Sequence, residues 1–206
     1  MRSELIPYGI DTELFRPLPS SFARAMWGVS EDVPVICAVA QQLHAKRKGM
    51  DILLQAVLRI REPVQLLLAG ENRDLVIPPN VSVRIVEPIQ DPRLLRAFYA
   101  AADVVAVPSR EDNLPNVMLE ALACGVPVVG SRIGGIPDAV RPEETGWLAD
   151  SEDIESWVVG LESALKAVRD NPVSWRGRTR SVAEREYSLA TQAERYRSLF
   201  EVVATS

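Results

Sequence analysis

The sequence predicts an α/β fold built on a doubly wound, mostly parallel β-sheet. Short apolar runs alternate along the chain with longer amphipathic segments of helical period, which is the order expected when strands and helices take turns. The apolar runs are nearly continuous, which indicates strands covered on both faces and therefore a parallel sheet. After the last such run only helical patterns follow, so we expect helices beyond the sheet.

Six apolar runs are predicted strands. Most are rich in valine, isoleucine and leucine and are bounded by turn-forming residues. The third run alternates apolar and other residues, as a strand does. The predicted strands cover residues 34–39, 64–69, 81–86, 103–107, 126–129 and 146–149.

The amphipathic segments between and after these runs are predicted helices. Asp91 and Pro92 form a helix start, with aspartate as the cap and proline in the first turn. Gly125 marks a helix end, and Gly134-Gly135 opens one further helical turn. The longer predicted helices cover residues 50–60, 91–101, 115–124, 152–169, 174–186 and 189–203.

Composition and charge narrow the classes of function. The chain has 206 residues and a formal net charge of −5, so it has no basic field for nucleic acid. Cys37 and Cys124 fit no zinc or redox spacing, and we expect buried, reduced thiols and a cytoplasmic location. No apolar run approaches the roughly 18 residues of a membrane span, and we see no signal-peptide pattern.

The candidate binding residues lie in loops that follow the predicted strands. In a parallel sheet of this kind, ligands bind at the carboxyl ends of the strands. These loops cover residues 41–48, 70–74, 87–91, 108–114 and 130–135.

The first of these loops is strongly basic. Lys46, Arg47 and Lys48 stand just before Gly49 and a predicted helix start. A helix N-terminus offers unpaired N–H groups and partial positive charge, so neighbouring cations favour binding of a phosphate or diphosphate. A solvated basic turn would give the same pattern. His44, the single histidine, could add to such a loop but is not assigned as a catalytic base.

A pair of carboxylates follows the fourth predicted strand. Asp112 and Glu120 are eight positions apart, a spacing that puts both on one helical side, about two turns apart. Such a pair could hold a hydroxyl-rich ligand, although acids near a helix start also simply favour the macrodipole. Glu120 fits that simpler explanation poorly, because it lies in an apolar helix segment where a carboxylate needs partners or a ligand.

Gly134 and Gly135 stand at another predicted helix start. Paired glycines there let a ligand approach backbone amides closely, and a tight turn that needs positive φ explains them equally well. The sequence shows no Ser/His/Asp or Cys/His set and no cluster of metal ligands, so we expect no metal.

Four segments, taken in order, carry a resemblance to a known family. They are IPYGIDTELFRP (6–17), RKGMDILLQA (47–56), PSREDNLPNVMLEALACGVPVVGSRIGGIPDAV (108–140) and GWLA (146–149). They resemble the C-terminal domain of family-4 glycosyltransferases, over nearly the whole chain. The resemblance implies a GT-B architecture, in which two Rossmann-like domains face each other across a cleft and the C-terminal one holds the activated sugar donor.

The resemblance also implies sugar transfer with retention of configuration. By this resemblance, the transfer reaction needs no metal or other cofactor and uses a nucleotide-diphosphate sugar as substrate. Basic side chains neutralise the diphosphate leaving group. Lys48 matches the family's diphosphate lysine. Asp112 matches the acid assigned to the donor sugar and Glu120 the acid assigned to the ribose, and we take these two as the catalytic residues. The further donor-binding candidates are Arg47, Gly49, Asn113, Leu114, Asn116, Gly134 and Gly135.

This sequence departs from the family pattern at three places. Asp112 stands where the family has glutamate, which is one methylene longer, so sugar preference can shift. Pro115 stands where many members have glycine, which removes one backbone donor. The glycine–arginine pair usual before the lysine is not visible, and Gln41-Gln42 stand nearby.

These patterns divide the chain into three parts. Residues 1–30 are a turn-rich lead-in, 31–170 a Rossmann-like nucleotide-sugar-binding domain, and 171–206 C-terminal helices that pack on it and towards a missing N-terminal domain. That acceptor-binding domain is the expected partner, and without it we expect no transfer. The resemblance also allows peripheral membrane association of the full-length enzyme.

Three other functions fit some of the same features. A nucleotide-sugar epimerase could use this scaffold, but the stretch from DNLPN to GGIPD argues against it. A non-catalytic binding module could keep the fold, but retention of Lys48, Asp112 and Glu120 argues against that. A glycosidase places its carboxylates across the sugar from each other, whereas here both lie on one helix and the loop before it.

Overall fold

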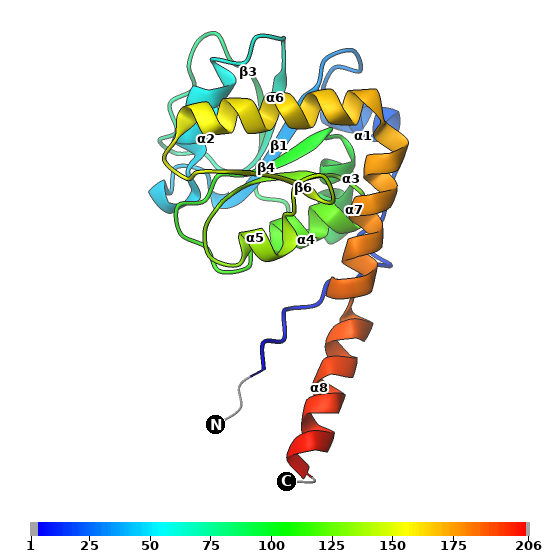
Figure 1. Ribbon diagram of the computed structural model, residues 1–206. Coiled ribbons are helices and arrows are strands. Elements are labelled where there is room, and N and C mark those ends of the chain that lie inside the picture. The colour runs from blue at the N-terminus through cyan, green and yellow to red at the C-terminus, as the bar shows by residue number, and fades with distance from the viewer. Residues whose placement is uncertain (1–3, 205–206) are drawn as a thin grey trace.

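The computed structural model describes residues 4–204 and places six parallel strands in one sheet with helices on both faces (Figure 1). The strand order is β3-β2-β1-β4-β5-β6, so the chain winds outward in both directions from the middle. The predicted doubly wound fold is therefore confirmed. The strands are β1 Val35–Gln42, β2 Gln65–Glu71, β3 Ser82–Val86, β4 Val104–Val107, β5 Val128–Ser131 and β6 Gly146–Ala149.

The fifth strand begins two residues later than the sequence predicted. Pro127 has no N–H to donate to a neighbouring strand, and only its carbonyl is used, as acceptor for the Val105 N–H at 3.0 Å. The regular ladder therefore starts at Val128.

The predicted helices are confirmed, with ends that differ by up to three residues. A short 3₁₀ turn, η1, and the single turn α5 join them. The helical elements are α1 Ser20–Trp27, η1 Lys46–Lys48, α2 Met50–Val57, α3 Pro92–Ala100, α4 Asn116–Ala123, α5 Ile136–Ala139, α6 Ile154–Asp170, α7 Pro172–Tyr187 and α8 Leu189–Ala204.

Helix α1 was not predicted, because residues 1–30 carry the turn signals of a lead-in segment, and the short turn η1 lies in a segment predicted as loop. Pro19 before the helix and Gly28 at its C-cap are boundary signals that could have revealed it. Residues 1–3 and 205–206 of the predicted end segments lie outside the described residues.

Arg24 anchors α1 to the amino-terminal edge of the sheet. Its guanidinium Nη2 lies 2.6 Å from Oδ2 of Asp103, and its Nε donates to the carbonyl of Ala101 at 3.1 Å. Oδ2 of Asp103 also accepts from the N–H of Val35, at the start of β1. This partly buried pair lies at the edge opposite the loops that follow the strands.

Two apolar layers cover the sheet. Helices α1, α3, α4, α5 and α7 contribute to the first layer, and α2, α6 and Trp175 of α7 contribute to the second. Along β1, Val35 and Cys37 belong to the first layer, whereas Ile36 and Ala38 belong to the second. This alternation shows why the strands are apolar on both faces. Cys37 and Cys124 are free, buried thiols, as expected.

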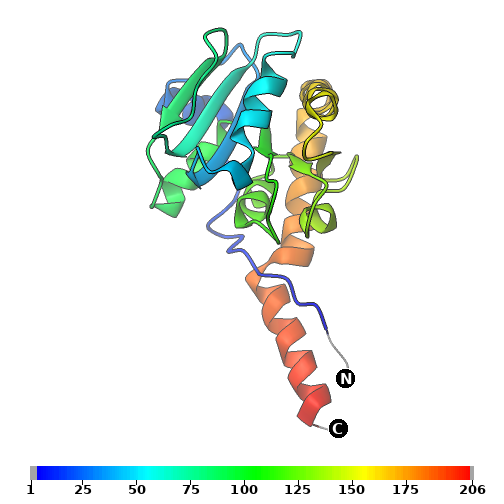
Figure 2. The ribbon, with the colours of Figure 1, turned by 90° about the vertical axis from the view of Figure 1, so that its left-hand side faces the viewer.

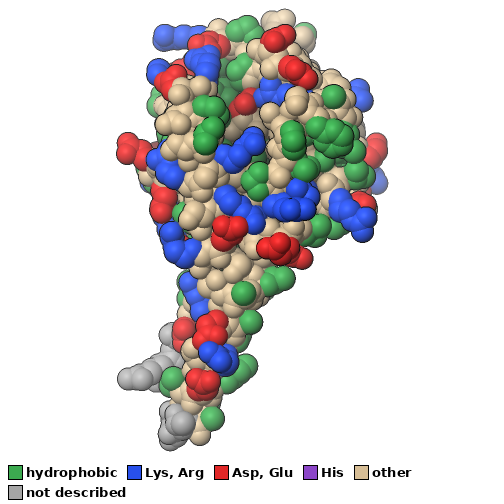
Figure 3. Space-filling view, turned by 90° about the vertical axis from the view of Figure 1, so that its right-hand side faces the viewer, with side chains coloured by type: hydrophobic (Ala, Val, Ile, Leu, Met, Phe, Trp, Pro, Cys, Tyr) green, Lys and Arg blue, Asp and Glu red, His purple; other side chains and the backbone are tan. Residues whose placement is uncertain are grey.

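Helix α8 projects away from the sheet, and the N-terminal segment runs on the same side of the molecule (Figures 1 and 2). The two meet where Ile10 bridges Ser188, and none of the described residues of α8 is buried. Positive and negative side chains are interspersed on the face over α7 and α8 (Figure 3). Between residues 4 and 204, no helix is long and apolar enough to cross a membrane.

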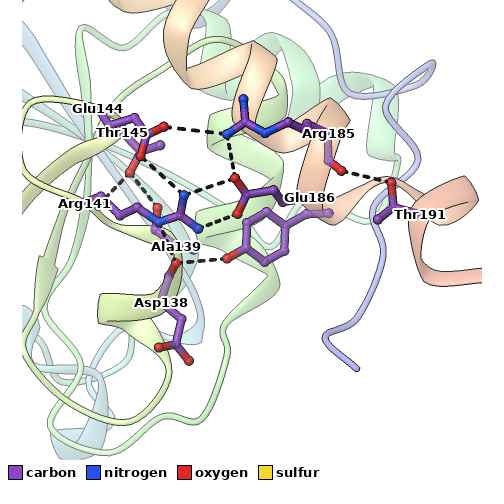
Figure 4. A network of polar contacts seen from close by, with 9 residues as sticks. Asp138, Ala139, Arg141, Glu144, Thr145, Arg185, Glu186 and Thr191 are labelled. Atoms are coloured by element: carbon purple, nitrogen blue, oxygen red, sulfur yellow. Dashed lines mark hydrogen bonds and ion pairs between the residues drawn. The ribbon is translucent and has the colours of Figure 1, made fainter. Parts of the chain in front are cut away.

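Arg141 joins the loop after α5 to the end of α7 (Figure 4). Both terminal nitrogens of its guanidinium pair with the carboxylate of Glu186, and Nη1 also lies 3.3 Å from Glu144. Hydrogen bonds from Arg141, and after them one from Arg185, lower the pKa of Glu186 to about 2. The Tyr187 hydroxyl donates to the carbonyl of Asp138 at 3.1 Å. The network holds α5, and the paired glycines before it, against the C-terminal end of α7.

We expect Arg24→Ala to lower the free energy of unfolding by roughly 2–4 kcal/mol, because it leaves the Asp103 carboxylate without its charged partner. Urea unfolding measures this loss. Arg93→Ala, which removes an exposed arginine from α3, is the matched control and should change stability by no more than about 0.5 kcal/mol. Equal losses in the two variants would contradict the anchoring role.

Candidate functional site

The loops after β1 and β4 meet at the place where the winding of the sheet reverses. Strands β1 and β4 are neighbours, and the chain runs from them towards opposite edges. A crevice forms at the carboxyl ends of two such strands and is the usual ligand site in doubly wound sheets. The loop 43–49 forms one wall of this crevice and the loop 108–115 the other.

Arg110 fastens the two loops together. Its backbone N–H donates to the carbonyl of Arg47 at 2.7 Å, and its Nη1 donates to the carbonyl of Lys46 at 2.8 Å. The guanidinium also forms a bidentate pair with Asp51, at 2.6 and 2.9 Å, and its Nε lies 2.7 Å from Glu152. Hydrogen bonds to Asp51 raise the pKa of Arg110 and lower that of Asp51. Arg110 therefore connects the two loops through several hydrogen bonds.

Glycines fit the backbone of these loops closely at two places. Gly49 has a φ of 67°, and a Cβ there would lie 1.8 Å from the carbonyl oxygen of Pro108. Gly134 has a φ of 49°, and a Cβ there would lie 2.1 Å from the carbonyl oxygen of Asp112. Gly135 donates its N–H to the carbonyl of Asn113 at 2.6 Å. The predicted glycines thus allow the backbone segments around the site to approach each other closely.

Lys48 and Asp112 form an ion pair across the crevice. The Nζ of Lys48 lies 2.6 Å from Oδ2 of Asp112, and the two side chains are only 20% and 16% exposed. The Ser109 hydroxyl donates to the same oxygen at 3.2 Å, and Oδ1 accepts from the N–H of Asn113 at 3.2 Å. Both residues are predicted site residues, but their pairing was not predicted.

The predicted placement of Asp112 and Glu120 on one helical side is wrong. Helix α4 begins at Asn116, after an extended Pro115 with ψ of 126°, so Asp112 lies in the preceding loop. The two carboxylates nevertheless line the same cavity.

Glu120 has a buried partner that the sequence analysis missed. The hydroxyl of Tyr99, on α3, donates to Oε2 of Glu120 at 2.6 Å, and Tyr99 is fully buried. Burial raises the pKa of Glu120, whereas the hydrogen bond from Tyr99 lowers it. Burial, followed by the nearby Glu120 charge, raises the pKa of Tyr99. A tyrosine on the apolar face of α3 needs a polar partner for its hydroxyl, and that was the available signal.

A cavity of about 540 Å³ lies between these loops and α4. Tyr8, Val39 and Leu95 contribute to its apolar wall, and Val117 and Asn116 lie at the start of α4. No described side chain caps this helix N-terminus, which therefore keeps its partial positive charge. The predicted site residues that line the cavity are Lys48, Asp112, Leu114, Asn116 and Glu120.

The remaining predicted residues lie around this cavity. Arg47 is exposed and is not among the described residues that line it. Asn113 and Gly135 line an adjacent cavity of about 440 Å³ that shares Leu114 with the first. His44 lines a third cavity with Lys46. Across residues 4–204, no group of three or more His, Cys, Asp and Glu side chains could hold a metal ion.

Comparisons with known proteins identify relatives of this chain. The sequence model of a family described as Glycosyl transferases group 1 matches residues 33–167. The D-inositol 3-phosphate glycosyltransferase of Segniliparus rotundus is 37% identical over 178 residues, which cover 80% of this chain and 39% of that protein. The enzyme of the same description from Mycolicibacterium smegmatis is 31% identical, over 80% of this chain and 40% of that protein. The chain thus spans about two fifths of the length of these curated relatives.

Solved structures share the fold. The sucrose-phosphate synthase of Thermosynechococcus elongatus has a TM-score of 0.78 and 29% identity, and the match covers 98% of this chain and 53% of that one. Alr3699/HepE of Anabaena, solved in complex with UDP-glucose, has a TM-score of 0.81 and 20% identity, over 97% of this chain and 57% of that one. These likenesses agree with the predicted Rossmann-like fold.

We expect Arg110→Ala to speed amide hydrogen exchange in residues 46–51 and 108–113 by roughly tenfold or more, since charged hydrogen bonds contribute about 1.5–3 kcal/mol each. Mass spectrometry of peptides from the two loops measures the change. Arg132→Ala is the matched control, because Arg132 forms an exposed pair with Asp150 in a neighbouring loop. Unchanged exchange in both loops of Arg110→Ala would refute the fastening role.

We expect Glu120→Gln to fold at least as stably as the parent chain near pH 8. Glutamine still accepts the Tyr99 hydrogen bond but carries no buried charge. Because burial raises the pKa of Glu120 in the folded state, ionisation of this group disfavours folding. The stability gain of the variant should therefore grow as pH rises from about 4 to 8. Thermal unfolding across this range, with the exposed Glu111→Gln as control, measures it. A gain that falls with rising pH would contradict this sign.

Proposed function

This chain belongs to the glycosyl transferases group 1 family, and we propose that it binds the nucleotide-diphosphate sugar donor of a retaining glycosyltransferase. One observation carries the proposal. The crevice between β1 and β4 brings together a lysine, an uncapped helix N-terminus and two carboxylates around a cavity of about 540 Å³. Phosphates suit the first two groups, and hydroxyls suit the carboxylates.

We assign the diphosphate to Lys48 and the first turn of α4. The ammonium group has three donors, and its pair with Asp112 uses one of them. The N–H groups of Asn116 and Val117 lie at the helix start beside the cavity, where a diphosphate would meet favourable partial charge. These groups would neutralise the leaving diphosphate in place of a metal ion, and we propose no cofactor.

We assign the ribose of the nucleotide to Glu120. Tyr99 holds Oε2 of this carboxylate, and Oε1 is then available to accept from ribose hydroxyls. The fixed hydrogen bond orients the carboxylate before a ligand arrives, which reduces the entropy lost on binding.

We assign the donor sugar to Asp112 and the backbone around it. Asn113, Leu114 and Gly135 line the second cavity, which adjoins the first through Leu114. A hexose beyond the diphosphate would reach this region. The acidic loop that Gly134 supports would then contact sugar hydroxyls.

We propose that transfer needs a second domain that carries the acceptor. The chain spans only about two fifths of the curated relatives' length, and closure of two domains is what excludes water and completes such sites. The chain alone would therefore bind donor without transferring sugar. The free, buried thiols of Cys37 and Cys124 suit a reducing compartment, and we place the activity in the cytoplasm.

We expect Lys48→Ala to weaken binding of a nucleoside diphosphate and of its glucose conjugate to a similar degree. Loss of a charge-assisted hydrogen bond of about 1.5–3 kcal/mol corresponds to a roughly ten- to hundredfold loss of affinity. Calorimetry with UDP, GDP and ADP and their glucose conjugates measures this effect.

Lys46→Ala is the matched control for this experiment, because Lys46 belongs to the same turn but lines another cavity. It should leave the affinities unchanged. An unchanged diphosphate affinity in Lys48→Ala, or an equal loss in the two variants, would remove Lys48 from the site.

A further inference from the structure

We infer that Asp112 makes this site select the sugar-conjugated donor over the free nucleoside diphosphate that transfer releases. The inference rests on the proposed function and deepens it. It assigns a discriminating role to the carboxylate that pairs with Lys48.

The cation that would bind phosphate already has a counterion. Oδ2 of Asp112 lies 2.6 Å from the Nζ of Lys48, and both side chains are mostly shielded from water. Among the described residues that line this cavity, Lys48 is the one cation, whereas Asp112 and Glu120 are anions. Any phosphate that reaches Lys48 therefore arrives close to a negative charge.

Asp112 is fixed in this position by its backbone. The carbonyl of Asp112 packs against Gly134, where a Cβ would lie 2.1 Å away. The next carbonyl, of Asn113, accepts from the N–H of Gly135. On the other side, Arg110 ties the same loop to the carbonyl of Arg47. The loop is held from both sides, and the carboxylate itself is held beside Lys48 by the ion pair and by the hydroxyl of Ser109.

Arg110 is unsuited to replace Lys48 as the counterion of Asp112. Its guanidinium is engaged by Asp51, Glu152 and the carbonyl of Lys46. Binding of a phosphate by Lys48 would thus weaken the charge compensation of Asp112, leaving the hydroxyl of Ser109 and the N–H of Asn113 as its donors.

The two ligands differ in what they offer this carboxylate. The terminal phosphate of a nucleoside diphosphate is a monoester-like group with a second pKa of about 6, so it carries close to two negative charges at neutral pH. In the sugar conjugate the same phosphate is a diester with a single charge, and the sugar hydroxyls beyond it can donate to Asp112. Like charges a few ångströms apart in a partly buried site repel strongly. The carboxylate therefore weakens binding of the free diphosphate more than binding of the sugar conjugate.

The test compares the affinities of one nucleoside diphosphate and its glucose conjugate for the parent chain and Asp112→Asn. The pair used is the one among UDP, GDP and ADP that binds the parent chain most tightly. The parent chain should bind the conjugate more tightly than the free diphosphate. Asp112→Asn should bind the free diphosphate about tenfold more tightly, which is about 1.4 kcal/mol, and the conjugate no more tightly than the parent does.

Two further variants make the result specific. Glu111→Gln removes the same charge from an exposed neighbour in the same loop and should leave both affinities within about twofold, a change below about 0.4 kcal/mol. Asp112→Ser removes the carboxylate with a smaller side chain and takes the place of Asp112→Asn if that variant does not fold. The order of the two parent affinities needs no variant at all.

The outcomes separate this inference from the proposed function. A diphosphate affinity that stays the same or falls in Asp112→Asn, or a parent chain that prefers the free diphosphate, overturns the inference. The proposed function survives that result if Lys48→Ala still weakens both ligands. If neither ligand binds the parent chain, or if Lys48→Ala changes nothing, the proposed function fails and the inference fails with it.

Discussion

The whole candidate site depends on the contact of Arg110 with the loop that follows β1. The sheet brings the ends of β1 and β4 side by side, but adjacent strands do not by themselves fix the loops beyond them. Arg110 fixes them by donating to Asp51, Glu152 and the carbonyl of Lys46. Arg110 is engaged in these contacts, and among the described residues that line the cavity Lys48 is the one cation.

Each charged group in the cavity is held by a particular neighbour. Lys48 compensates Asp112, and the buried hydroxyl of Tyr99 supports Glu120, whose pKa burial raises. In the described lining of the cavity, positive potential comes from the ammonium group of Lys48 and from the start of α4. A ligand therefore meets positive charge and acceptors for its hydroxyls within a short distance. A molecule that carries phosphates next to hydroxyl-bearing rings complements this pattern better than a purely anionic or purely neutral one.

The sequence predicts the sheet well, because nearly continuous apolar runs are typical of parallel strands that helices cover on both faces. It predicts the site partly. Lys48 and Glu120 stand out by charge in their local setting, but Arg110 and Tyr99 do not, because their partners lie 59 and 21 positions away. Local spacing also put Asp112 and Glu120 on one helical side, whereas α4 begins only at Asn116, after the extended Pro115, and Asp112 lies in the loop before it. Side-chain pairs between residues far apart in the chain cannot be predicted from the local pattern of a single sequence.

The central claim is that the crevice between β1 and β4 holds a nucleotide-diphosphate sugar, and a crystal structure of the chain grown with the tightest-binding conjugate tests it most directly. We predict diphosphate oxygens within hydrogen-bond distance of the Lys48 ammonium and the first turn of α4, with the ribose at Glu120. A ligand bound only in the cavity beside Arg141, or in the one lined by His44, would contradict it.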